Sequence, residues 1–182
     1  MRAVISAFFL FVVAQTSAFA APGMTWAQEK AWLVQNPGVQ SGSVHHGYDA
    51  DLGVNTGLAR VQALRRWWTV HVTLTHGDVV TEESFTPDKG GGAIRTQGGP
   101  VVAALFDSMY GGSAVASEYA NASLVVSVPM NGSNASQQFF AAKNGKYGFM
   151  LDPYEIVVFR SSELQQRIKR AKYCSTHSEC GE

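Results

Sequence analysis

The sequence lacks the charge imbalance that marks many nucleic-acid-binding and membrane-surface proteins. Its 182 residues carry 14 Lys and Arg against 14 Asp and Glu, so the formal net charge at pH 7 is zero. Attraction to phosphate backbones and anionic lipids depends on an excess of Lys and Arg. We therefore expect no nucleic-acid partner for this chain.

Long apolar runs are absent after the first twenty residues, although a membrane-spanning helix needs about 20 consecutive apolar residues. The chain starts with Met1-Arg2, continues with an apolar run over 3–14, and reaches the small-x-small triplet Ala18-Phe19-Ala20. This order is typical of a cleavable secretory signal. The alternative is an uncleaved membrane anchor, but no stop-transfer pattern follows. We predict a signal peptide over 1–20, export to the periplasm or the cell exterior, and no membrane span after signal removal.

Cysteine is nearly absent, since Cys174 and Cys180 are the only two in the chain. In an exported protein, two cysteines so close in sequence most simply form a disulfide, and this is our prediction. The alternative is a zinc site, in which His177 would lie between the two cysteine ligands. A fourth ligand is missing from that part of the sequence.

Several familiar catalytic motifs are also missing. The chain has no serine nucleophile elbow, no phosphate-binding loop and no paired-histidine metalloprotease motif. One loop concentrates metal-binding side chains, with His45 and His46 followed by Asp49, Asp51 and Asn55. Calcium coordination by the last three is one reading, but the glycine and terminal glutamate positions of a calcium loop are lacking. A solvated loop is the favoured reading, and we predict no metal site.

The patterns that are present predict an α+β fold: a mostly antiparallel sheet with an N-terminal, a central and a C-terminal helix. Thr25 and Gln28 have capping-box spacing before a short helical stretch that ends at Asn36. Apolar and polar residues then alternate over 67–75, as in a strand with one buried face. Strand-like segments follow over 79–86, 124–130, 137–142, 146–151 and 155–160.

Helices are predicted in two further places. Pro100 suits a first helical position, and apolar residues at helical spacing follow to Met109. A second capping box at Ser162 and Gln165 predicts a basic helix to about Lys172. The segments 38–57 and 89–99 are predicted to be loops from their composition. We expect one globular domain over 21–182 with no internal repeat.

Three positions carry a family resemblance. His76-Gly77 ends a predicted strand, Tyr110 ends a predicted helix, and Glu155 heads the β-branched segment that runs into Ser162-Glu163-Leu164. This order, and the segment 154–164 in particular, resembles the ADP-ribosyltransferase fold of the poly-ADP-ribose-polymerase type.

The resemblance implies a role for each residue. His76 would hydrogen-bond a ribose hydroxyl of NAD, and the backbone of Gly77 would hold the nicotinamide amide. Tyr110 would stack on the nicotinamide ring. Glu155 would be the catalytic group, because its carboxylate would stabilise the positive charge that develops on the ribose as nicotinamide leaves.

Ser117 and Tyr119 are similar to the Ser and Tyr that follow the first Tyr in that family, and Tyr119 would wall the same NAD pocket. The implied activity is transfer of ADP-ribose from NAD to an unknown acceptor, or NAD hydrolysis, by a toxin- or effector-like protein.

A second reading needs no enzyme. The exported domain would bind a protein or a glycan, using Trp67 as a stacking surface or the loops at 38–57 and 87–99. The sequence leaves both readings open, and a folded chain should bring His76, Tyr110 and Glu155 to one cleft if the enzyme reading holds.

Overall fold

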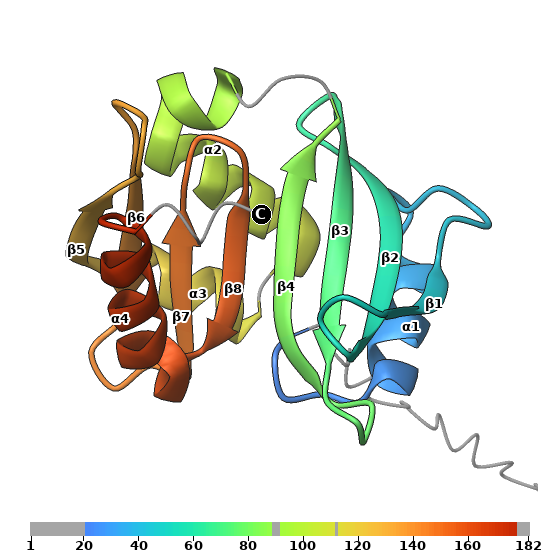
Figure 1. The fold of residues 1–182 in the computed structure, drawn as a ribbon. Helices are drawn as coiled ribbons and strands as arrows, with labels where there is room; N and C mark the ends of the chain where they lie inside the picture. Colours follow the sequence, from blue (N-terminus) through green and yellow to red (C-terminus); the bar gives the residue numbers. More distant parts are fainter. Residues whose placement is uncertain (1–20, 89–91, 112, 178–182) are drawn as a thin grey trace, which may run out of the picture.

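The computed structural model describes residues 21–88, 92–111 and 113–177, with only the backbone described for 92–98. These residues form the predicted α+β fold, with four α-helices and one eight-stranded antiparallel sheet (Figure 1). The predicted signal peptide lies outside the described residues. No helix in the described ranges is long and apolar enough to cross a membrane.

The sheet consists of two four-stranded meanders. The first meander contains β1 (His45–Asp49), β2 (Val54–Ala63), β3 (Arg66–Leu74) and β4 (Val80–Pro87). The second meander contains β5 (Ser123–Pro129), β6 (Ser136–Ala141), β7 (Tyr147–Leu151) and β8 (Ile156–Arg160). The strand order is β1-β2-β3-β4-β8-β7-β6-β5, so the last strand of the first meander, β4, pairs with the last strand of the second, β8. In that pair Phe85 lies opposite Ile156, and Glu82 lies opposite Phe159.

Three helices cover one face of the sheet, and the fourth lies on the other face (Figure 1). The first three are α1 (Trp26–Gln35), α2 (Gly92–Tyr110) and α3 (Ala114–Ala120). They enclose the larger core, whose fully buried large side chains include Leu33, Trp68, Phe85, Phe106 and Tyr110. The fourth, α4 (Leu164–Cys174), follows a short 3-10 turn, η1 (Ser161–Glu163).

The second, smaller core lies under α4 and includes only strands of the second meander. Leu164, Ile168 and Ala171 of α4 pack on Val128, Phe139, Met150, Val157 and Phe159. Among the described residues, no helix lies over the corresponding face of the first meander (Figure 1). One half of the sheet is therefore covered on both faces, and the other half on one face.

Burial along the strands reflects this difference. In β3 the even-numbered residues from Trp68 to Leu74 are buried, whereas the residues between them are exposed or half-buried. In β8 all four residues of Ile156–Phe159 are buried. Since successive strand residues point to opposite faces, alternation goes with one covered face and continuous burial with two.

The two predicted capping boxes have different outcomes. The first is confirmed, because the Thr25 hydroxyl accepts from the Gln28 backbone N–H and the Gln28 side chain accepts from the Thr25 N–H at 3.0 Å. The second is wrong. Glu163, not Ser162, stands at the N-cap of α4 and makes no side-chain cap hydrogen bond. The η1 turn instead carries the chain directly from β8 into the helix.

Three other local predictions are corrected. The segment 38–57 is not only loop, because it contains β1 and the start of β2. The helix predicted from Pro100 begins at Gly92, with Pro100 inside it, so part of the predicted loop 89–99 is helical and 89–91 lie outside the described residues. The helix α3 was not predicted, although Val115 and Tyr119 are buried at i,i+4 spacing.

Candidate functional site

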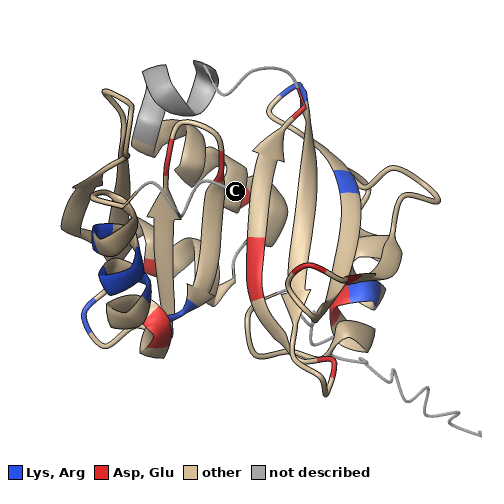
Figure 2. Cartoon of the chain, in the orientation of Figure 1, with Lys and Arg blue, Asp and Glu red and all other residues tan. Residues whose placement is uncertain are grey.

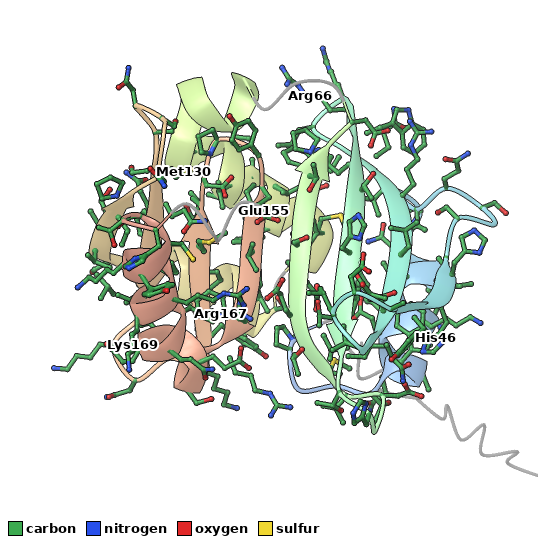
Figure 3. All side chains as sticks on the ribbon, viewed as in Figure 1. His46, Arg66, Met130, Glu155, Arg167 and Lys169 are labelled. Atoms are coloured by element: carbon green, nitrogen blue, oxygen red, sulfur yellow. The ribbon has the colours of Figure 1, made fainter. Side chains whose placement is uncertain are left out.

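A groove of about 540 Å³ runs between α4 and the sheet, at the boundary of the two meanders. Figure 3 shows Glu155 next to the start of β8 and Arg167 on α4, both on the side of the second meander. We call this the α4 groove. Its lining combines apolar, acidic and basic side chains: Glu82, Gln137, Phe139, Met150, Glu155, Val157, Glu163, Gln166, Arg167, Arg170, Ala171 and Cys174.

Glu155, the predicted catalytic residue, lies in this groove. It precedes β8 by one residue, so it shares the α4 face of the sheet with Val157 and Phe159. Burial raises the pKa of its carboxyl to about 7, with further contributions from the negative charges of Asp152 and Glu82. A hydrogen bond from Ser84 and the positive charge of Arg167 oppose this increase. Near neutral pH the Glu155 carboxyl therefore exchanges its proton.

Arg167 is held by two carboxylates. Its Nη2 lies 2.5 Å from Oε2 of Glu82 and 3.0 Å from Oε2 of Glu163. The guanidinium also stacks over the ring of Phe159, at 4.5 Å from the centroid. Such contacts fix the position of a guanidinium and neutralise much of its charge.

Glu155 has no ion pair of its own within the described part of the chain. A half-buried carboxyl that makes no ion pair can act as a proton acceptor or donor, or accept hydrogen bonds from a cationic ligand group. Either action is available to Glu155, because it faces the space of the α4 groove.

His76 and Gly77 lie elsewhere. They form the turn between β3 and β4, which the backbone hydrogen bond from Thr75 N to Val79 O closes at 2.9 Å. Glu155 lies beside the other end of β4, next to the position of Thr86, because Ile156 pairs with Phe85. The length of β4 separates the two places by about 20 Å at roughly 3.3 Å per residue.

Tyr110 lies on the opposite side of the sheet from the groove. It is fully buried in the larger core and donates a hydrogen bond to Glu83 Oε2. The Trp32 ring stacks on it at 5.8 Å with an interplanar angle of 12°. The place that the resemblance assigns to nicotinamide is thus filled by a side chain of α1.

Ser117 and Tyr119 lie on α3. Ser117 is exposed, whereas Tyr119 packs edge-on against Phe106 at 4.9 Å and Phe149 at 5.2 Å. Burial raises the pKa of the Tyr119 hydroxyl to about 12. The structure therefore brings Tyr110 and Tyr119 into one aromatic core, with Phe106 between them, but it brings neither to Glu155 or His76.

Cys174 ends α4 and lines the α4 groove. Cys180 lies outside the described residues, so the disulfide between the two stays a prediction. His177 stacks on Tyr173 at 3.9 Å, and its Nδ1 lies 2.9 Å from the Tyr173 carbonyl oxygen. Within the described ranges, no three His, Cys, Asp or Glu side chains gather as metal ligands.

A second group of titratable side chains is enclosed in the larger core. Glu29 of α1 and Glu83 of β4 are 0% and 1% exposed. Both Glu29 oxygens and Oε1 of Glu83 have no hydrogen-bond partner. Burial, together with the Coulomb interaction of the two carboxyls, raises the pKa of Glu29 well above its usual value, and burial raises that of Glu83 to about 7. Both side chains are almost fully enclosed, so we consider their effect on stability.

The residues around Glu155 were not found from the sequence. Glu82 and Ser84 come from β4 and Arg167 from α4, and only the pairing of β4 with β8 brings them together. One local signal existed. The run Glu82-Glu83-Ser84 places polar side chains on both faces of a strand, which an ordinary half-buried strand avoids.

Comparison with protein families, curated proteins and solved structures finds no match to this chain. The functional argument therefore depends on the site itself.

Proposed function

We propose that this chain is an exported, non-catalytic binding protein whose ligand lies in the α4 groove and presents an amino group to Glu155. The observation that carries this proposal is a half-buried carboxyl without an ion pair in a groove of about 540 Å³. Pockets of a few hundred Å³ with few convergent polar groups are typical of small-ligand sites.

The charges of the lining determine the class of ligand. Glu82 and Glu163 share the single positive charge of Arg167, whereas Glu155 has no ion pair among the described residues, so Glu155 is the carboxyl with room for a new cationic partner. Phe139, Met150 and Val157 supply an apolar floor. An amino sugar or a short peptide with a free amine matches this combination, because it offers an ammonium group beside an apolar backbone or ring face.

Binding of an ammonium group should depend on pH in a defined direction. Glu155 must be ionised to pair with it, and its pKa of about 7 means that ionisation is completed only above neutrality. For a ligand whose amine stays protonated over this range, such as a lysine side chain with a pKa of about 10.4, the affinity should therefore rise as the pH increases from 6 to 8, about tenfold per unit on the acidic side of the Glu155 pKa.

The test measures binding of glucosamine trimer and trilysine to the purified protein by isothermal titration calorimetry at pH 6, 7 and 8. N-acetylglucosamine trimer serves as the matched ligand without the ammonium groups. We expect Glu155→Gln to abolish the pH dependence and weaken binding about tenfold or more. Asp51→Asn, in an exposed turn outside the groove, should behave like the parent. Equal binding of the acetylated and free trimers would contradict the proposal.

Transfer of ADP-ribose from NAD is the other candidate, because Glu155 heads β8 at a groove as the resemblance implies. Release of nicotinamide from NAD by the parent and by Glu155→Gln tests it directly. Turnover that is lost in the variant would replace the binding proposal with the enzymatic one.

A further inference from the structure

The turn between β2 and β3 lies between two hollows of opposite character. One, of about 390 Å³, is lined by Arg60, Arg65, Arg66, Trp67, Pro87 and Asp88. The other, of about 510 Å³, is shallow, and the described residues that line it are all apolar: Leu64, Pro100, Val101 and Ala104. Leu64 and Arg65 are consecutive residues of the turn, so a ligand at this end of the sheet can contact both hollows at once. Figure 3 shows Arg66 at this end.

The charge of the first hollow is not balanced. Asp88 is occupied by Arg60, whose Nε donates to Oδ2 at 2.7 Å, and by Thr69, whose hydroxyl donates to Oδ1 at 2.9 Å. Arg65 and Arg66 are exposed and have no ion-pair partner among the described residues. Two guanidinium groups with free donors therefore point to an anionic ligand group, a carboxylate or a phosphate.

Trp67 adds an aromatic wall to the cationic hollow. Its ring is half-buried on the open face of the first meander and carries the Arg60 guanidinium at 4.9 Å from the centroid. The neighbouring Trp68 points to the opposite face and is fully buried in the larger core. Trp67 is thus held in place by Arg60 and remains partly accessible to a ligand.

The backbone of the turn is unusual for its residues. Leu64 and Arg65 have φ angles of 55° and 60°, in the left-handed region. Two-residue hairpin turns of this kind favour Asn-Gly, because bulky side chains are strained there. The strained pair places an apolar side chain beside one hollow and a cationic side chain beside the other, and strain of this kind is often found at binding sites.

We propose that the β2–β3 turn binds a single-chain anionic amphiphile such as a fatty acid. Its headgroup lies at Arg65 and Arg66, and its chain lies along the apolar hollow of Leu64 and α2. A membrane surface is a poorer fit, because polybasic lipid-binding segments have about 4–8 clustered Lys and Arg. Figure 2 shows Lys and Arg mainly on α4, and the basic residues described around the cationic hollow are three, Arg60, Arg65 and Arg66, with Asp88 beside them.

The first experiment compares decanoate, octanoate and decanol, each below its critical micelle concentration, by isothermal titration calorimetry with the purified protein. Decanoate should bind more tightly than octanoate by about fourfold for each added CH₂, from about 0.8 kcal/mol per buried CH₂. Decanol should bind at least about tenfold more weakly than decanoate, since it lacks the charged headgroup.

Variants separate the two halves of the site. The double substitution Arg65→Gln and Arg66→Gln should weaken decanoate binding about tenfold or more and leave decanol unchanged. Leu64→Ser should reduce the difference between decanoate and octanoate. Arg170→Gln, an exposed arginine of the α4 groove, is the matched control and should bind decanoate like the parent.

Three results would overturn the proposal. They are equal affinities for decanol and decanoate, equal affinities for inorganic phosphate and decanoate, and binding to phosphatidylglycerol vesicles without binding to monomeric decanoate. Thermal unfolding of each variant shows whether it is folded, and Glu155→Gln should leave decanoate binding unchanged. Failure at this turn is therefore distinguishable from failure of the proposed α4-groove function.

Discussion

The two meanders have the same connectivity but different surroundings. Each is a run of four antiparallel strands, and the last strand of each pairs with the last strand of the other. The second meander is packed between α2 and α3 on one face and α4 on the other, whereas the first meander leaves one face open (Figure 1). The α4 groove lies where the covered half meets the open half, and the β2–β3 turn lies at one end of the open half.

This difference shows how covering a face of the sheet with a helix determines which side chains the strands can place on that face. On the open face, His71 and the threonines of β3 contact solvent, so polar residues there cost little. Under α4, Phe159 and Val157 fill a closed layer. A polar group at the edge of that layer, such as Glu155, is partly desolvated, and its pKa rises to about 7 for that reason. The boundary between the halves thus produces a titratable site.

The largest effect should come from removing a side chain in the covered half. Phe159→Ala should destabilise the protein by about 3–5 kcal/mol, because the ring is fully buried between α4 and the sheet and carries the Arg167 guanidinium. His71→Ala on the open face should stay within about 0.5 kcal/mol of the parent. Chemical denaturation of both variants measures the difference, and similar losses would show that the two halves are equally covered.

The buried carboxyls of Glu29 and Glu83 in the larger core should produce the next largest effect on stability. The folded-state pKa of Glu83 is raised to about 7 from a usual 4.5. Its contribution to stability is therefore complete below pH 4.5 and lost as the pH rises through 7, by roughly 3 kcal/mol. Glu83→Gln should remove this loss, so the variant should be more stable than the parent at pH 8 and similar to it at pH 4.5.

The control for that experiment is the adjacent residue on the other face of β4. Glu82→Gln breaks the contact with Arg167 and leaves the enclosed pair Glu29 and Glu83 intact. It should therefore keep the part of the pH slope that Glu29 and Glu83 cause, and change only the contribution of Glu155, whose pKa the Glu82 charge helps to raise. A Glu83→Gln variant that retained the full slope would show that the enclosed pair does not control it.

A smaller effect should come from one glycine in each half. A Cβ at Gly148 of β7 would overlap the Phe159 ring, and one at Gly57 of β2 would overlap the Trp26 ring. Overpacking costs about 1–3 kcal/mol. We expect the cost of Gly148→Ala to lie at the upper end of this range and that of Gly57→Ala at the lower end. Phe159 is fully buried under α4, whereas Trp26 is the first residue of α1 and its side chain is 8% exposed. Thermal unfolding of both variants ranks them, and the reverse order would contradict this reasoning.

The smallest difference concerns the helix caps. Thr25→Ala should cost about 1 kcal/mol, since it removes the capping box of α1. Ser162→Ala should cost less than about 0.5 kcal/mol, because Ser162 makes no cap hydrogen bond to α4. Urea denaturation measures the free energy of unfolding of both variants. Equal losses would show that Ser162 does cap α4, as the sequence predicted.

Local sequence patterns predicted much of the fold but little of the site. The alternation in β3 and the apolar run of β8 were enough to place those strands, because each pattern follows from side-chain direction along a strand. Glu155 was singled out from the sequence, and it does line a groove. The residues predicted beside it, His76 and Tyr110, lie in a distant turn and in the opposite core.

By itself the sequence determined the α+β class, the capped start of α1 and most strand positions, since these depend on periodicity and short-range hydrogen bonds. Only the tertiary structure decided that β4 pairs with β8, that α4 covers one half of one face, and that Glu83 is enclosed whereas Glu82 faces Arg167. These outcomes depend on contacts between residues far apart in the chain. Which strands pair, and which face a helix covers, depend on how all the apolar faces can be buried at once, and no local sequence pattern encodes this.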